Sequence, residues 1–444
     1  MKNKMPLMKM EIKKEEIEMT VVDEIVKKKK GYTLHFVKTD QYKTNTIVWK
    51  MKAPLENETV TLRALLPYVL QNSSKKYPTT TSLQSYLEEL YGANFFVDVG
   101  KKGEYHIMSF SIELANEKFL KEKTPLLRTG LDFLASILLA PNAENGRFHE
   151  SSVTSEKRIL KQRLQSLFDD KMRYASQRLI EEMCENEPYA LHPYGRLDDV
   201  DSISSESLYQ YYERALREDE LDLYVVGDVD FEEVEDVCDQ LFLLSDRQPK
   251  LVKKRSIPSR SEVKVVKEQQ YVKQGKLNIG YRTHVSFGDP DYFALQVFNG
   301  IFGGFSHSKL FLNVREKESL AYYASSRLES HKGLMMVMSG IESKNYEKAV
   351  AIIRKQLEAM KNGDFSDKEI EQTKAVIHNQ LLETIDTQRG LIEMLYHNVL
   401  AKKNVTVEDW LQGIVEASDS EIVKVAEKIE MDTIYFLSGQ EGLN

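Results

Sequence analysis

The clearest architectural signal in the chain is the stretch SSESLYQYYERALREDELDLYVVGD at residues 204–228, because its plan returns as SDSEIVKVAEKIEMDTIYFLSGQ at residues 418–440. Each stretch opens with a cap rich in Ser, Asp and Glu and continues with a helical pattern. Acidic residues, a short apolar strand and a glycine then follow. This repeat predicts two halves of similar plan, each an α+β combination of antiparallel sheet and flanking helices.

The segments before each repeat carry further strand and helix signals. Residues 29–54 and 93–114 show the alternation of β-branched and aromatic residues that is typical of strands, and the second half shows it at residues 270–283 and 320–341. Helices are predicted where apolar residues recur every three or four positions. These are residues 124–140, 151–183, 345–361 and 367–401.

One stretch lacks a clean period and separates the two halves. Residues 240–262 contain Pro, Ser and a basic cluster, which is typical of a linker. We therefore expect an N-terminal half at residues 1–240, a linker at residues 241–262 and a C-terminal half at residues 263–444.

The composition argues against several classes of protein. Lys and Arg number 61 against 69 Asp and Glu, so the formal net charge of −8 argues against nucleic acid as a partner. Lys and Glu interrupt the apolar residues near the start, and no apolar run of roughly 18 residues follows, so neither a secretory signal nor a membrane span is expected. With two cysteines among 444 residues, a reducing cytoplasm is the expected location.

Short motifs for catalysis are absent from the sequence. The nine histidines include no pair at the spacing of three or four residues that aligns two imidazoles on a helix, so a local zinc site is unsupported. There is no GxxxxGK[ST] phosphate loop and no GxSxG nucleophile turn. Cys184 lies among glutamates that would raise the pKa of its thiol, so we interpret it as a packing residue.

The most suggestive segment is a glycine-rich turn that leads into a helix and a strand, at residues 299–326. It places Arg315 and Tyr322 at a junction where a guanidinium and a phenol could hydrogen-bond a carbonyl group. The residues by themselves favour a structural role. In that interpretation Arg315 pairs with Glu316 or Glu318 at the surface, and Tyr322 occupies a half-buried strand position.

Several sequence stretches occur along the chain in an informative order. They include KKYPTTTSLQSYLEELYGANF at residues 75–95, HPYGRLDDVDSIS at 192–204 and GGFSHSKLFLNVREKESLAYYASS at 303–326. Their order resembles that of the pitrilysin/insulinase family, in its mitochondrial-processing-peptidase-like branch. The resemblance implies two homologous α/β-roll domains in each half, four in all, in a clam-shell arrangement over an extended peptide.

Active members of this family carry an inverted zinc motif, HxxEH, just before the KKYP-like loop, with a further Glu ligand on a later helix. Matching the loop places the motif on ALLPY, so Ala64 and Tyr68 occupy the imidazole positions and Pro67 the general-base position. Glu156 is retained on the later helix, but the ligand position seven residues on holds Arg163, which would repel Zn²⁺. The resemblance implies no catalytic residue and no metal in this chain, which alone should hydrolyse no peptide.

Arg315 and Tyr322 match the substrate-binding pair of active members, and a short glycine-rich loop at residues 300–304 resembles that of non-catalytic subunits. In paired members one subunit carries the zinc motif and the other supplies the Arg/Tyr element. This chain looks like the second kind, a non-catalytic subunit of a heterodimeric zinc peptidase. It would contain no cofactor and would position a peptide or unfolded segment for a homologous zinc-bearing partner.

Two alternatives remain open from the sequence. The first is a non-proteolytic peptide-binding or scaffold protein of the same fold. The second is a self-sufficient peptidase with relocated ligands, which the absence of a histidine pair disfavours.

Overall fold

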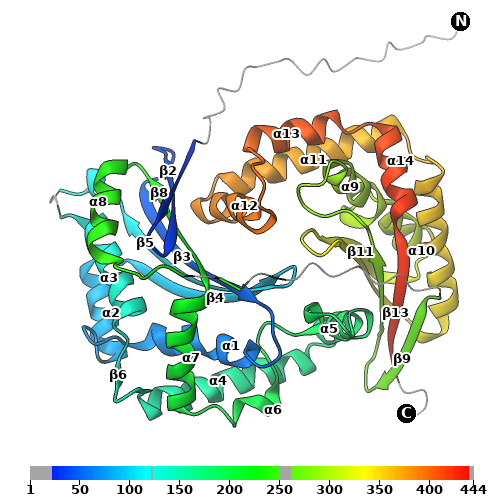
Figure 1. Ribbon diagram of the computed structural model, residues 1–444. Coiled ribbons are helices and arrows are strands. Elements are labelled where there is room, and N and C mark those ends of the chain that lie inside the picture. Colours follow the sequence, from blue (N-terminus) through cyan, green and yellow to red (C-terminus); the bar gives the residue numbers. More distant parts are fainter. Residues whose placement is uncertain (1–22, 122–123, 248, 251, 253–261, 440–444) are drawn as a thin grey trace, which may run out of the picture.

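A computed structural model describes residues 23–121, 124–247, 249–250, 252 and 262–439. Figure 1 shows an N-terminal unit, coloured blue to green, beside a C-terminal unit, coloured yellow-green to red. Each unit is built on one large twisted sheet with helices around it.

The N-terminal sheet has six strands in the order β1-β2-β8-β3-β5-β4. Its strands are β1 (Glu24–Lys29), β2 (Tyr32–Lys38), β3 (Thr44–Pro54), β4 (Asn94–Lys102), β5 (Tyr105–Ala115) and β8 (Glu220–Gly227). Strands β2 and β8 are parallel, and the other neighbours are antiparallel. A separate two-stranded ribbon joins β6 (Ala143–Glu144) and β7 (Arg147–Phe148).

The helices of this unit follow the predicted periodicity. They are α1 (Val60–Asn72), α2 (Thr80–Glu89), α3 (Leu126–Leu139), α4 (Glu150–Asp169), α5 (Lys171–Met183), α6 (Leu197–Val200), α7 (Ser205–Glu218) and α8 (Phe231–Leu241). The apolar faces of these helices, α5 excepted, bury one face of the sheet, where Trp49, Phe110 and Leu223 are fully enclosed.

The C-terminal sheet has five strands in the order β11-β12-β10-β13-β9. The strands are β9 (Lys264–Gln270), β10 (Gly275–Arg282), β11 (Ala321–Glu329), β12 (Leu334–Ile341) and β13 (Glu430–Gly439). The helices are α9 (Tyr292–Asn299), α10 (Tyr346–Lys361), α11 (Asp367–Ile385), α12 (Gln388–Ala401), α13 (Val407–Glu416) and α14 (Asp419–Lys428), with helical turns η3 (Gly300–Gly304) and η4 (Phe311–Lys317).

The two sheets share one topology. Strands β2-β8-β3-β5-β4 of the first correspond in order and direction to β9-β13-β10-β12-β11 of the second, and β1 is an addition. The repeat seen in the sequence is α7–β8 and α14–β13, and both helices begin with a capping box, on Ser204 and Ser418. The prediction of two halves of similar α+β plan is therefore confirmed.

The expected number of α/β units needs correction. The resemblance implied two in each half, but within the described residues each half contains one large sheet. The reason is that segments distant in the sequence pair within the same sheet. Strand β13, from the end of the second half, pairs with β10. Strand β8, from the end of the first half, lies between β2 and β3. In each half the late strand therefore joins the same sheet as the early strands.

The units exchange their second long helices. Helix α5 packs against β10 and β13 of the C-terminal sheet, and α12 covers the face of the N-terminal sheet that is turned toward the C-terminal unit. The approach of α5 requires Gly280, where a Cβ would lie 2.5 Å from Met183 Sδ. Gln388 of α12 accepts hydrogen bonds from Thr44 and Thr46 at 2.9 and 2.7 Å. This exchange fixes how the two units sit against each other.

Candidate functional site

Helices α1 and α4 cross where the resemblance places the metal centre of active relatives. Tyr68 projects from α1 and Arg163 from α4, and the guanidinium carbon of Arg163 lies 3.8 Å from the centre of the Tyr68 ring. The sequence placed these residues 95 positions apart, and the structure brings them into a cation–π contact. A guanidinium stacked on a phenol therefore occupies the space between the two helices.

The remaining positions of the motif are equally unsuited to a metal. Ala64 is fully buried and has no ligand atom, and Pro67 lies inside α1, which continues through it to Asn72. Glu156 is buried and accepts a hydrogen bond from Asn72 Nδ2 at 2.8 Å, so its carboxylate stabilises the contact between α4 and α1. These side chains do not fit a zinc ion.

A wider search of the described part of the chain gives the same result. Among residues 23–439, outside the gaps noted above, no group of three or more His, Cys, Asp or Glu side chains is arranged to hold a metal. Burial raises the pKa of Tyr68 to about 12, against the opposing effect of Arg163, so the phenol stays protonated at neutral pH. A protonated phenol is neither a zinc ligand nor a general base.

The predicted substrate-binding pair lies in the C-terminal unit. Arg315 is in η4 and Tyr322 is on β11, the edge strand of its sheet. The Arg315 guanidinium lies over the Phe311 ring at 4.5 Å, and its Nε is 3.6 Å from a carboxylate oxygen of Glu316. The surface ion pair expected from the residues thus exists with Glu316, whereas Glu318 pairs with Lys348 at 2.7 Å.

The interpretation of Tyr322 as a half-buried strand residue is wrong. Tyr322 is 81% exposed, because it lies where the register of the edge strand β11 is shifted by a bulge between Ala321 and Ala324. The preceding glycine-rich turn η3 is tightly packed against the same strand. A Cβ on Gly303 would lie 2.6 Å from Ser326 Oγ, so this glycine is required by close packing.

Sequence reasoning missed a network of charged groups where the two units meet. Glu187, which follows α5, accepts hydrogen bonds from Arg282 at 2.6 Å and pairs with Lys332 at 2.6 Å. Arg282 also pairs with Asp432 at 3.0 Å, and Lys332 with Glu104 at 2.6 Å. These partners are between 95 and 228 residues apart, so no local pattern could have signalled them.

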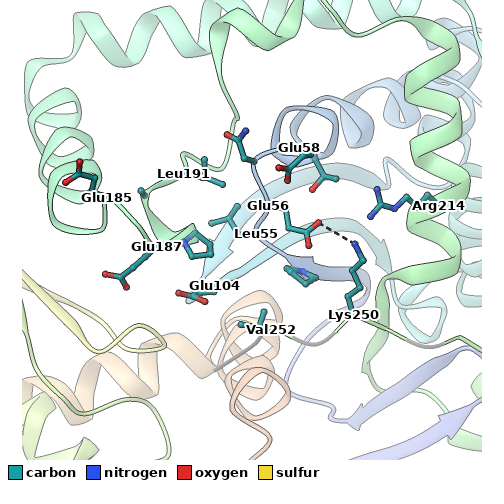
Figure 2. Close-up of a pocket in the computed structure, with 15 residues that line it drawn as sticks. Leu55, Glu56, Glu58, Glu104, Glu185, Glu187, Leu191, Arg214, Lys250 and Val252 are labelled. Atoms are coloured by element: carbon teal, nitrogen blue, oxygen red, sulfur yellow. Dashed lines mark ion pairs between the residues drawn. The ribbon is translucent and has the colours of Figure 1, made fainter. Parts of the chain in front are cut away.

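The network borders a cavity of about 850 Å³, shown in Figure 2. Five glutamates line it together with Arg214 and Lys250. Glu104 and Glu187 are engaged in the network, and Glu56 pairs with Lys250 at 3.7 Å (Figure 2). The lining carboxylates therefore include several that already have cationic partners, and they do not converge as an acid–base pair.

Two histidines that are 66 residues apart in the sequence are adjacent in the structure. His331 Nε2 and His397 Nδ1 are 2.7 Å apart, and their rings stack with centroids 4.8 Å apart. Burial, with Lys102 nearby, lowers the pKa of His331 to about 4 and that of His397 to about 3. The backbone of His331 also contacts Gly103 in the β4–β5 turn, so this pair lies at the junction of the two units.

Comparisons with known proteins agree with this description. The family model described as the peptidase M16 inactive domain matches residues 202–377. The probable inactive metalloprotease YmfF of Bacillus subtilis (strain 168) is 54% identical over 424 residues, covering 96% of this chain and all of that protein. A crystal structure of a conserved protein from Enterococcus faecalis V583 superposes with a TM-score of 0.89 at 36% identity, covering 95% of this chain and all of that one.

A more distant relative is the antilisterial bacteriocin subtilosin biosynthesis protein AlbE of Bacillus subtilis. It is 23% identical over 391 residues, covering 86% of this chain and 93% of that protein. The fold and the altered centre define a peptidase-like protein of two equivalent sheet-and-helix units. The chain belongs to the peptidase M16 family, the pitrilysin/insulinase family, as an inactive homologue.

No helix among the described residues is long and apolar enough to cross a lipid bilayer.

Proposed function

We propose that this chain is the non-catalytic subunit of a heterodimeric zinc-dependent peptidase, which helps to bind and position peptides for a homologous zinc-bearing partner. The observation that carries the proposal is the contrast between its two candidate sites. The centre on α1 and α4 is filled by Arg163 and Tyr68, whereas Arg315 and Tyr322 remain presented on the C-terminal unit. A subunit that needs a metal from its partner would keep the second element and lose the first.

The chemistry of the exposed pair fits such a role. Stacking on Phe311 restricts the Arg315 guanidinium, so less conformational entropy is lost when its planar donors bind a carbonyl or an oxyanion. The Tyr322 hydroxyl is a second donor, and its 81% exposure leaves it available to a partner-bound peptide. Donors of this kind act by stabilising the negative charge that develops on the scissile carbonyl.

The names of relatives offer limited support. One relative is named for the biosynthesis of a bacteriocin, subtilosin, and another as a probable inactive metalloprotease. We propose a peptide or an unfolded protein segment as the substrate. We also propose a cytoplasmic location, where the buried thiols of Cys184 and Cys238 would stay reduced.

The test is a tagged pull-down of this chain from its own cell, analysed by native mass spectrometry and zinc content. The expected result is a 1:1 complex with a partner of similar mass that carries about one zinc per complex. Recovery of a metal-free monomer or homodimer would contradict the proposal and favour a peptide-binding scaffold.

Variants of the purified pair then test the role of the exposed element. Tyr322→Phe should lower kcat/KM, whereas Tyr271→Phe should not, although Tyr271 is 82% exposed beside β9 on the opposite edge of the same sheet. Equal activity of the two variants would show that Tyr322 does not contribute to the activity of the zinc-bearing partner.

A further inference from the structure

Unlike Arg63 and Arg178 of the same unit, Arg163 has no acidic partner among the described residues. Arg63 pairs with Asp219 at 2.6 Å, and Arg178 pairs with Glu181 at 2.6 Å. Within the described residues no carboxylate oxygen lies within 4.0 Å of the Arg163 guanidinium. No carboxylate in the described part of the chain therefore balances its positive charge at contact distance.

The nearby acidic group does not change this balance. Asp98 of β4 acts on the Tyr68 phenol through space, but its carboxylate is 3.8 Å from Arg389 of α12. The contact that the structure gives the guanidinium is with the Tyr68 ring, and Leu160 and Leu164 of the same helix are buried.

The guanidinium is also held in place. The Tyr68 ring supports the guanidinium carbon at 3.8 Å, and the side chain remains partly exposed. A stacked guanidinium offers a rigid fork that matches the two oxygens of a carboxylate. Because the fork is already ordered, binding costs less side-chain entropy than for a free surface arginine.

The site lies beside a surface suited to an extended chain. Helix α1 packs against β4, the last strand of the N-terminal sheet, and Gln71 of α1 donates a hydrogen bond to the Phe95 carbonyl of that strand at 3.4 Å. A peptide that followed this edge would pass the crossing of α1 and α4.

We propose that Arg163 and Tyr68 form a binding subsite for a carboxylate of the peptide ligand. The carboxylate is either the C-terminal group or an Asp or Glu side chain, since both present the same two oxygens. The inference rests on the proposed peptide-binding function and names its chemical preference. The position that holds a divalent ion in active relatives would here hold a monovalent cation that binds an anion without activating water.

The test is fluorescence polarisation of labelled peptides on the full-length chain. Three unstructured decapeptides of Ala, Ser and Leu serve as probes. One has a free C-terminus, the second is its C-terminal amide, and the third is the amide with a central Glu. We expect the amide without Glu to bind about tenfold more weakly than whichever carboxylate form is preferred. The preferred form identifies the source of the carboxylate.

Variants assign the effect to the site. Arg163→Gln should abolish the discrimination between the peptides, and Arg163→Lys should retain part of it through charge alone. The matched control is Arg158→Gln, an exposed arginine on the same helix, which should behave as the wild type. Thermal unfolding of each variant shows whether it is folded.

The outcomes separate the two proposals. Equal binding of all three peptides to the wild-type chain, or unchanged discrimination in Arg163→Gln, would overturn the carboxylate subsite and leave the peptide-binding function standing. If none of the peptides binds the wild-type chain, peptide binding by this subunit fails and the subsite fails with it.

Discussion

The substitution Arg282→Met should destabilise the protein strongly, because Arg282 lies at the centre of the charge network between the two units. Its side chain is 3% exposed and pairs with Asp432 and Glu187, whose side chains are 3% and 7% exposed. It also donates a hydrogen bond to the carbonyl of Met183 at the end of α5 at 3.0 Å. The arginine thus joins the helix that crosses from one unit to the sheet of the other.

The magnitude follows from the charge balance of the network. In the wild type, three carboxylates contact two cations. Arg282→Met removes the cation that pairs with Asp432 and one of the two cations that pair with Glu187, and removing one partner of a buried pair costs about 3–5 kcal/mol. Glu187→Gln leaves two carboxylates with two cations, and the amide oxygen still accepts a hydrogen bond, so we expect a cost of about 1–2 kcal/mol.

Urea unfolding at pH 7, followed by circular dichroism, measures both costs. The double variant should lose less than the sum of the single variants, because the two residues share one interaction. A loss for Arg282→Met that does not exceed the loss for Glu187→Gln would refute the charge-balance reasoning.

The same network predicts a pH dependence. Burial works to raise the pKa of Glu187, but hydrogen bonds from Arg282 and Lys332 outweigh it, so the pKa is lowered. A lowered folded-state pKa contributes stability above the unfolded value of about 4.3. That contribution should be lost as the pH falls through the folded-state pKa, and the difference between wild type and Glu187→Gln should then shrink.

Three further predictions concern the other sites. The isolated chain should bind no zinc by equilibrium dialysis and elemental analysis, and Tyr68→His should not change this, because Arg163 still opposes the ion. In the purified pair, Arg315→Ala should lower kcat on the order of a hundredfold if it stabilises the oxyanion, and an unchanged kcat in a steady-state assay would exclude that role. The lowered pKa values of His331 and His397 mean that the folded state binds fewer protons than the unfolded state, so stability should fall as the pH drops below about 6.5. Unfolding measured between pH 7 and pH 5 should show a weaker dependence in His397→Gln, and an identical dependence would contradict the reasoning.

Much of the fold could be predicted because it depends on local signals. The capping serines Ser204 and Ser418, the helical periodicity after them and the apolar strands that follow all lie within about two dozen residues. The number of units could not be predicted in the same way. It depends on pairings such as β13 with β10, whose partners are about 150 residues apart and are selected by the packing of the whole sheet.

The candidate site likewise has features that could be predicted from the sequence and features that could not. The chemistry lost at Ala64, Pro67 and Tyr68 is a matter of residue identity, so the sequence was sufficient to predict that the chain lacks the family's zinc ligands. The exposure of Tyr322 was predicted wrongly, because the local sequence does not reveal the bulge that shifts the register of β11 between Ala321 and Ala324.

The sequence by itself determined the α+β class, the repeat of two similar halves and the absence of zinc-binding side chains at the matched positions. The tertiary structure alone decided that Arg163 stacks on Tyr68 without an acidic partner, that α5 and α12 are exchanged between units, and that Glu187 and Arg282 form part of a buried network. The physical reason is the distance along the sequence over which each interaction acts. Caps, periodicity and ligand identity are properties of neighbouring residues, whereas stacking, charge balance and exposure depend on groups that the chain brings together only on folding.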